Sequence, residues 1–168
     1  VLPGPQEGVF SPEGIDTFYS SFYSIGTESD RMGYRLSGPE ISHKGSPDII
    51  SEAVPMGSIQ VPGNGLPIIM LSDSQTTGGY PKIACVIHAD LHLLARLAPG
   101  DILSFKRCGM SEAVESSANL KKKLSRIRTL LADHRSLGSR GRIQQPDSGS
   151  LKLHLCGKSY YVSWERVM

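Results

Sequence analysis

A polar segment with the chemistry of a ligand-binding loop follows an almost unbroken apolar run in the middle of the chain. Residues 66–74 read LPIIMLSDS, and residues 75–81 read QTTGGYP. Gln75 can donate and accept hydrogen bonds at once, and two threonine hydroxyls add donors. Consecutive glycines allow backbone conformations that other residues avoid, so their amides could point inward and bind an anion. The segment therefore predicts either a polar ligand site or a tight structural turn.

Two side chains that flank the glycine pair extend this candidate site. Tyr80 precedes Pro81, which favours an extended backbone and would project the tyrosine ring over a pocket. Asp73 stands two residues before Gln75, where the apolar strand ends. Both readings of the segment, site and turn, stay open on this chemistry alone.

Upstream residues add charges that such a site would use. The stretch DRMGYRL, residues 30–36, carries Arg31 and Arg35. The flat guanidinium fork recognises carboxylates and phosphates through paired hydrogen bonds, although surface ion pairing is the alternative. Glu52 stands in the apolar context IISEAV. It would serve as a general base, as a buried partner of an arginine, or as a solvated residue at a loop edge.

The patterns of metal sites and of common catalytic motifs are absent from the sequence. His88 and His92 are four residues apart, but Asp90 between them is a better helix cap than a ligand, and no third ligand is close in sequence. No metal is therefore expected. There is no phosphate-binding glycine loop and no glycine-flanked nucleophile. Three cysteines without metal-ligand spacing indicate idle thiols in a reducing compartment.

Short elements joined by turns must position these residues. The chain has 18 glycines and 11 prolines, which favours short strands over a helix bundle. Ser11 and Pro12 predict a capped helix to about residue 20. The remaining expected elements are strands on either side of the turn 62–65, a loop over 45–55, a strand over 82–87, a short helix that Asp90 caps, and a strand over 102–105. The fold class expected is mainly β, a barrel or sandwich with two or three helices.

The last third of the chain differs in charge and pattern. Residues 1–105 hold 5 Lys and Arg against 11 Asp and Glu, whereas residues 106–143 hold 10 against 3. A basic helix is expected over 111–135, with one apolar stripe; because it lacks interleaved aromatic residues, a solvated face is favoured over nucleic-acid binding. A flexible glycine- and serine-rich linker and a hairpin with a reversal at Gly157-Lys158 follow. No run of roughly 18 apolar residues predicts a membrane span, and no signal peptide is visible.

Several motifs in order resemble one known family. They are VLPGPQ, SDRMGYRLSGP, SEAVPMGSIQVPGNGLPIIMLSDSQTTGGYPKIACV and DLHLLARLAPGD. These strings resemble the C-terminal half of the biotin-dependent carboxyltransferase family in its A-type form. That family includes the C-type component of 5-oxoprolinase, also called kinase-A-inhibitor-like protein or allophanate hydrolase subunit 2, and the matching region of urea carboxylase. The likeness is dense over about residues 1–105 and loose beyond them.

The resemblance implies a fold and a set of partners. The fold would be a cyclophilin-like β-barrel with peripheral helices, in which 1–110 form the carboxyltransferase core, 111–150 a basic helix and flexible linker, and 151–168 a hairpin that completes the barrel. An N-terminal half missing here would add a companion barrel, and the start at Val1 fits a fragment. The protein would be cytoplasmic and would work with partners of the B type and the A type, without nucleic acid or membrane.

The resemblance also implies an activity and its residues. The leading function is part of an ATP-dependent 5-oxoprolinase that converts 5-oxoproline to glutamate. One alternative is the carboxyltransferase domain of urea carboxylase or urea amidolyase, which takes a carboxyl group from carboxybiotin on a separate carrier; the other is a regulatory module that inhibits a kinase. Catalytic candidates are Asp73, Gln75 and Thr77. Candidates for substrate binding are Arg31, Tyr34, Arg35, Glu52, Gln60, Thr76, Gly78, Gly79, Tyr80 and Lys82. Arg96 departs from the family pattern, where a glutamine is expected.

Overall fold

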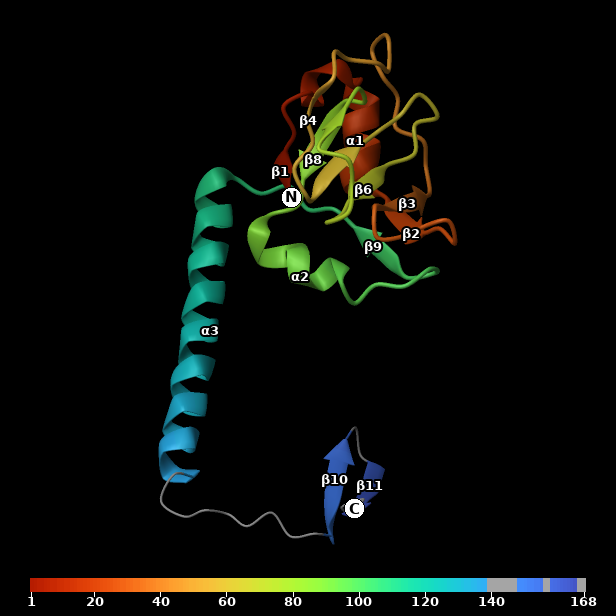
Figure 1. Cartoon of the computed structure of the whole chain (residues 1–168). Coiled ribbons are helices and arrows are strands. Elements are labelled where there is room, and N and C mark those ends of the chain that lie inside the picture. The colour runs from red at the N-terminus through yellow and green to blue at the C-terminus, as the bar shows by residue number, and fades with distance from the viewer. Residues whose placement is uncertain (139–147, 156–157, 166–168) are drawn as a thin grey trace. The chain divides into compact units, whose positions relative to one another are not determined.

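A seven-stranded antiparallel sheet forms the centre of the chain in the computed structural model, which describes residues 1–138, 148–155 and 158–165, and side chains to residue 132 (Figure 1). The strand order is β1-β8-β5-β6-β3-β2-β9. The strands are β1 (Leu2–Pro3), β2 (Phe22–Ile25), β3 (Gly33–Ser37), β5 (Ser58–Gln60), β6 (Ile68–Met70), β8 (Lys82–Cys85) and β9 (Ile102–Ser104). The chain divides into two compact units, residues 1–122 and 123–168.

The two outer strands of this sheet are linked through the segment that follows β9. The N-terminal amine of Val1 donates to the carbonyl of Lys106 at 2.7 Å, and the amide of Cys108 donates to the carbonyl of Val1 at 2.9 Å. The sheet therefore curls into a half-barrel. This arrangement, with three α-helices, confirms the predicted mainly β fold class.

The concave side of the sheet is filled by apolar side chains. Ile59, Ile69 and Ile83 come from the three neighbouring strands β5, β6 and β8, and none of them is exposed to solvent. Helix α1 (Pro12–Ser20) adds Phe18, whose ring stacks on Phe105 with centroids 4.5 Å apart. Burial is continuous along β5 and over Lys82–Ala84 of β8, whereas β2 and β3 place more accessible residues between buried ones, so the middle strands of the sheet are the most enclosed.

The predicted capped helix is confirmed. The Ser11 hydroxyl accepts a hydrogen bond from the amide of Gly14 at 3.0 Å, and Pro12 opens the helix. The strands around 62–65 are also confirmed, because β5 and β6 pair as a hairpin with Gly65 at φ +72°.

Two local expectations differ from the structure. The expected loop 45–55 contains the short strand β4 (Glu52–Ala53), which pairs with β7 (Thr77–Gly78). Asp90 ends the 3-10 helix η2 (His88–Asp90) and precedes α2 (Leu91–Leu94), which has four residues only, and its side chain makes no capping hydrogen bond. A second 3-10 helix, η1 (Glu7–Val9), precedes α1.

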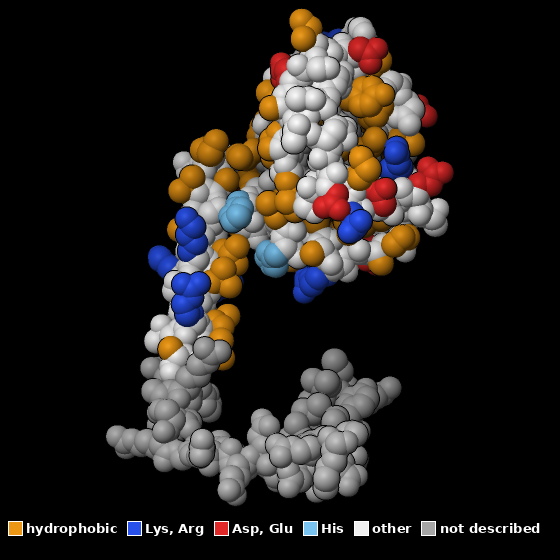
Figure 2. Space-filling model, in the orientation of Figure 1, with side chains coloured by type: hydrophobic (Ala, Val, Ile, Leu, Met, Phe, Trp, Pro, Cys, Tyr) orange, Lys and Arg blue, Asp and Glu red, His pale blue; other side chains and the backbone are white. Residues whose placement is uncertain are grey.

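The C-terminal third contains one long helix and one hairpin. Helix α3 (Met110–Gly138) carries exposed basic residues and an apolar stripe in which Leu124, Ile127 and Leu131 are 54–61% exposed (Figure 2). Strands β10 (Ser148–Leu155) and β11 (Lys158–Glu165) pair antiparallel with each other. Because Lys158 pairs with Leu155, it belongs to β11 and not to the reversal, which lies outside the described residues, as do the remaining linker 139–147 and Cys156. The completion of the barrel by this hairpin stays a prediction.

Within the described residues, no helix combines the length and the apolar character needed to cross a membrane.

Candidate functional site

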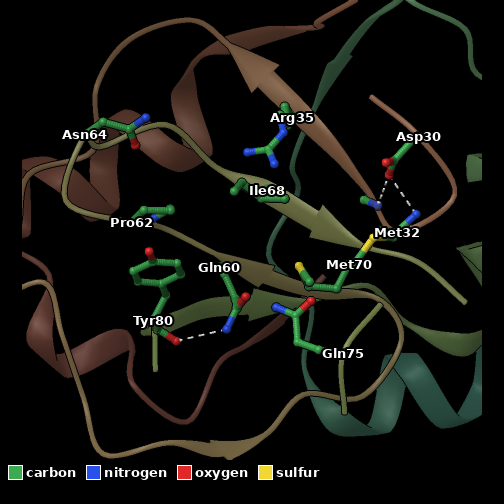
Figure 3. A pocket seen from close by; sticks show the side chains of 11 residues that line it. Asp30, Met32, Arg35, Gln60, Pro62, Asn64, Ile68, Met70, Gln75 and Tyr80 are labelled. Atoms are coloured by element: carbon green, nitrogen blue, oxygen red, sulfur yellow. Dashed lines mark hydrogen bonds between the residues drawn. The ribbon is translucent and has the colours of Figure 1, made fainter. Parts of the chain in front are cut away.

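A cavity of about 420 Å³ lies beside the bend that follows β6 (Figure 3). Its apolar wall comes from Met32, Pro62, Ile68 and Met70, and its polar lining comes from Asp30, Arg35, Gln60, Asn64, Gln75 and Tyr80. Small-molecule sites typically combine an apolar lining with a few convergent polar groups. The segment 75–81 therefore borders a cavity and is not only a structural turn.

Gln60 is the most firmly held polar side chain of this lining. It is 1% exposed, and its Nε2 donates to the carbonyl of Tyr80 at 3.2 Å. The hydrogen bond leaves the Gln60 side-chain oxygen on the cavity side, near Gln75 (Figure 3). Gln60 therefore offers an acceptor whose position is fixed, whereas the exposed Gln75 can turn either end of its amide inward.

The glycine pair acts through close packing and not through unusual backbone angles. The described glycines with positive φ are Gly57, Gly65 and Gly100, so neither Gly78 nor Gly79 has the left-handed conformation that an anion-binding nest requires. The predicted nest is therefore wrong. A Cβ at Gly78 would lie 3.0 Å from the Gln60 Nε2 atom, which explains why the bend needs glycine there.

Backbone hydrogen bonds hold the same bend against the loop 45–55. The amide of Val54 donates to the carbonyl of Thr76 at 2.8 Å, and the amide of Ile49 donates to the carbonyl of Gly79 at 2.9 Å. The side chains of Thr76 and Thr77 are exposed and do not line the cavity. The bend is thus a supported wall from which Gln75 and Tyr80 reach the cavity.

A buried lysine, Lys82, follows this bend as the first residue of β8 (Lys82–Cys85). Lys82 is 3% exposed, and its Nζ is 3.4 Å from Oε2 of Glu52. The same Glu52 oxygen accepts a hydrogen bond from Gln6 Nε2 at 2.6 Å, and Gln6 Oε1 accepts from the amide of Lys82 at 3.2 Å. Glu52 is therefore a partner of a cation, as one reading of the sequence expected, but the cation is a lysine. Gln6 lies 46 positions from Glu52 in sequence, and this contact was not predicted from the sequence.

Arg31 and Asp73 form a surface ion pair. Arg31 Nε is 3.4 Å from Asp73 Oδ2, and the two side chains are 91% and 46% exposed. Such exposed pairs contribute little to stability. Neither residue lines the 420 Å³ cavity, but Arg31 lines a separate cavity of about 370 Å³ with Tyr34, so its role in substrate binding stays a prediction.

Strand β3 separates Tyr34 from Arg35. Successive side chains of a strand point to opposite faces. The Tyr34 hydroxyl donates toward the carbonyls of Leu94 and Leu97, at 3.0 and 3.2 Å, and so supports α2. Arg35 lines the cavity on the other face.

The structure brings four of the thirteen candidates into the cavity lining, namely Arg35, Gln60, Gln75 and Tyr80. It adds Asn64, whose place in the turn 62–65 pointed only to turn chemistry. The Asn64 side-chain oxygen accepts from the amide of Leu66 at 3.1 Å, as turn asparagines do. A signal for Asn64 was therefore present, but it indicated local structure.

Other reactive groups lie away from this cavity. Burial raises the pKa of the Cys85 thiol, so this cysteine stays protonated near neutral pH. Among the described residues, no group of three or more His, Cys, Asp and Glu side chains has the arrangement of a metal site. The chemistry of the cavity is therefore that of hydrogen bonding, of one guanidinium from Arg35 and of one carboxylate from Asp30.

The curled antiparallel sheet and its polar cavity define a mainly β half-barrel domain. The sequence profile described as "Carboxyltransferase domain, subdomain A and B" matches residues 1–107, and the chain belongs to this family. The match ends near the point where the resemblance read from the motifs becomes loose. Helix α3 and the hairpin lie beyond it.

Particular relatives come from two enzyme systems. The C subunit of 5-oxoprolinase from Escherichia coli (strain K12) is 40% identical over 115 residues, which cover 68% of this chain and 37% of that protein. A putative urea carboxylase of Emericella nidulans is 29% identical over 137 residues, which cover 75% of this chain and 11% of that protein. The chain spans about two fifths of the length of the 5-oxoprolinase relatives, 37% of one and 42% of another.

Solved structures share the fold, and one of them comes from a urea amidolyase. The crystal structure of the K. lactis urea amidolyase matches with a TM-score of 0.69 at 26% identity, over 73% of this chain and 8% of that one. The crystal structure of TTHA0988 matches with a TM-score of 0.54 at 37% identity, over 62% of this chain and 20% of that one. The half-barrel is therefore the family's fold, and Arg35, Gln60, Gln75 and Tyr80 stand at its cavity.

Proposed function

We propose that this chain is part of the C-type component of an ATP-dependent 5-oxoprolinase complex, in which its cavity binds the amide substrate. The observation that carries the proposal is the pairing of two carboxamides, Gln60 and Gln75, at one cavity. A lactam such as 5-oxoproline presents an N–H and a C=O together, and two carboxamides offer the complementary acceptor and donor. The 40% identity to the C-type component of a 5-oxoprolinase supports the same substrate.

Within this proposal the cavity residues have separate tasks. Gln60 accepts from the ligand N–H, because its own amide nitrogen is used by Tyr80. Gln75 donates to the ligand carbonyl, and the Tyr80 ring covers the ligand. Asp73 and Thr77 stand on the same bend outside the cavity lining, so we assign them to contacts with groups that partner proteins bring.

The proposed complex supplies what the chain does not. A-type and B-type partners, and the N-terminal half that the family resemblance implies, would complete the site and consume ATP. The protein is proposed to work in the cytoplasm. No step of ATP chemistry is assigned to residues of this chain.

A second candidate is the carboxyltransferase domain of a urea carboxylase or urea amidolyase. It is favoured by the structural match to the urea amidolyase, whose TM-score is 0.69 over 73% of this chain. In that role the cavity would hold urea while carboxybiotin arrives on a separate carrier. The kinase-inhibiting module is a third candidate, which rests on the family resemblance alone.

Reconstitution tests the proposal. The full chain is combined with its A-type and B-type partners, and glutamate release from 5-oxoproline is measured with and without ATP; urea replaces 5-oxoproline in a parallel arm that contains biotin carboxylase and its carrier. The proposed function expects ATP-dependent glutamate. Turnover of urea alone would support the second candidate, and failure with both substrates would reject both.

Two variants link the result to the cavity. Gln75→Ala removes one neutral hydrogen bond to the ligand and is expected to lower kcat/KM by about 2- to 12-fold. Asn119→Ala removes an exposed carboxamide from α3 and is expected to leave kcat/KM unchanged. Equal kinetics for the two variants would show that the cavity does not bind the substrate.

A further inference from the structure

Among the described residues that line the 420 Å³ cavity, Arg35 is the one with a positive charge. It projects from β3 over Ile68, across the cavity from Gln60 and Tyr80 (Figure 3). Within residues 1–132 its guanidinium has no salt bridge within 4.0 Å and makes no hydrogen bond. The other cations near the site are engaged, Arg31 by Asp73 and Lys82 by Glu52.

Asp30, the acidic residue of the lining, makes no salt bridge with Arg35 within 4.0 Å. Asp30 Oδ1 accepts hydrogen bonds from the amides of Met32 and Gly33, at 2.8 and 3.2 Å. Its carboxylate is thereby held at the start of β3. Arg35 is itself exposed, so its fork of up to five N–H donors is open to solvent and to a group that enters the cavity.

The cavity therefore presents three kinds of surface to one ligand. A guanidinium lies on one side, the apolar side chains of Ile68 and Met70 form a floor, and the carboxamides of Gln60 and Gln75 lie on the other side (Figure 3). A ligand that matches all three carries an oxyanion, an aliphatic middle and an amide. Urea has only the amide.

We propose that Arg35 binds the carboxylate of the substrate and so selects a lactam or amide that bears a carboxylate over a neutral amide. The inference rests on the proposed function, and it names the residue that would separate the 5-oxoproline reaction from the urea reaction. Planar guanidinium and carboxylate groups pair through two parallel hydrogen bonds, which adds geometric selectivity to charge. Arg35 is a specificity residue in this role, not a catalytic one.

A competing anion would reach the same guanidinium from its other side. Arg35, Asn64 and Ile68 also line a neighbouring cavity of about 310 Å³, whose polar lining includes Thr27, Ser37 and the acidic Glu28. A phosphate group bound there would use Arg35 without reading the substrate's carboxylate. The experiment therefore includes inorganic phosphate as a separate arm.

The test compares two ligands that differ by one carboxylate. Binding of 5-oxoproline and of 2-pyrrolidinone, the same ring without the carboxylate, is measured by ligand-observed NMR and calorimetry on the full chain and by competition in the reconstituted complex. The wild type is expected to prefer 5-oxoproline by about 10- to 100-fold, the range for a charge-assisted hydrogen-bonding pair. Arg35→Gln should abolish the preference and leave 2-pyrrolidinone binding unchanged, whereas Arg35→Lys should keep part of it.

Matched controls separate charge from position. Arg96→Gln removes the same charge from an exposed residue outside the cavity lining and should keep the full preference. Thermal unfolding of both Arg35 variants shows whether they are folded. An unchanged preference in folded Arg35→Gln overturns the inference, as does a phosphate affinity that depends on Arg35 while the two ring ligands bind alike.

The inference and the proposed function can fail separately. If the complex releases glutamate from 5-oxoproline and Arg35→Gln leaves KM unchanged, only the role of Arg35 is rejected. If the preference for the carboxylate depends on Arg35 but no glutamate is formed with ATP, the ligand class stands and the oxoprolinase function is rejected. Absence of both binding and turnover rejects both.

Discussion

The substitution Gly78→Ala tests whether close packing of the bend on Gln60 builds the cavity wall. The new Cβ would lie 3.0 Å from Gln60 Nε2 and 3.2 Å from Val54 Cγ2. Both distances are tighter than ordinary van der Waals contact, and both neighbours are buried. Because Gly78 does not have a positive φ, the alanine backbone itself is allowed, and the effect comes from contact.

The magnitude follows from two opposing effects. Replacing glycine by alanine stabilises a protein by about 0.4–1 kcal/mol, because the unfolded chain loses freedom. Overpacking a tight site costs about 1–3 kcal/mol. Gly45→Ala is the matched control, since no atom lies within 4 Å of its added Cβ. The unfolded-state effect is shared, so Gly78→Ala should be less stable than Gly45→Ala by about 1–3 kcal/mol.

Hydrogen exchange of core amides in β5 and β6 measures this difference for the first unit, and ligand-observed NMR with 5-oxoproline reports on the cavity. Displacement of Gln60 should weaken its hydrogen bond to the Tyr80 carbonyl and lower ligand affinity, whereas Gly45→Ala should bind as the wild type does. If the two variants are equally stable and bind equally, the packing argument for the glycine is refuted.

Three further predictions follow from the same contacts. Burial raises the pKa of Tyr23 to about 12, so the free energy of unfolding should fall as pH rises above about 10, by about 1.4 kcal/mol at pH 11. Tyr23→Phe should lose this pH dependence in urea unfolding. Because the buried hydroxyl has no hydrogen-bond partner among the described residues, this variant should be no less stable than the wild type at pH 7. Tyr34→Phe should lower the free energy of unfolding by about 0.5–1.5 kcal/mol, because the hydrogen bonds of the hydroxyl to the carbonyls of Leu94 and Leu97 are lost. A large loss of 5-oxoproline affinity in this variant would contradict the placement of Tyr34 on the opposite face of β3 from Arg35. Glu52→Ala removes the carboxylate beside a buried ammonium and should lower the free energy of unfolding by about 1–2 kcal/mol, less than for a fully buried pair because Glu52 is half exposed. Lys82→Met removes the buried charge itself and should leave the free energy of unfolding nearly unchanged. Equal unfolding free energies for these two variants would contradict the role of Glu52 as the partner of the buried Lys82.

Local sequence signals predicted the parts of the fold that depend on neighbouring residues. Ser11 and Pro12 define a helix start through one hydrogen bond within the first turn, and the PGNG turn requires a positive φ at Gly65. Both features are settled within a few residues. The pairing of β4 with β7 is not determined by nearby residues, because Glu52 and Gly78 are far apart in sequence and each strand has only two residues. Short apolar patterns cannot reveal such a pair.

The candidate site was predicted in composition more than in arrangement. The glycine pair was interpreted through the freedom of its backbone, but Gly78 instead gives room to the buried Gln60. A glycine chosen for space and one chosen for φ look alike in sequence. Gln6 and Lys82 meet because β1 and β8 are neighbours in the sheet although they are far apart in sequence, so no spacing rule could bring them together.

The choice between Arg31 and Arg35 shows where a sequence argument could have gone further. Both follow Asp30, and two arginines four residues apart would share a face if the strand began before Arg31. Asp30 accepts hydrogen bonds from the amides two and three residues ahead, an Asx turn that delays the strand until Gly33. Strand alternation counted from Gly33 then directs Arg35 to the cavity and Tyr34 to α2, and it leaves Arg31 in the turn beside Asp73. A turn-forming aspartate therefore decides which arginine lines the 420 Å³ cavity.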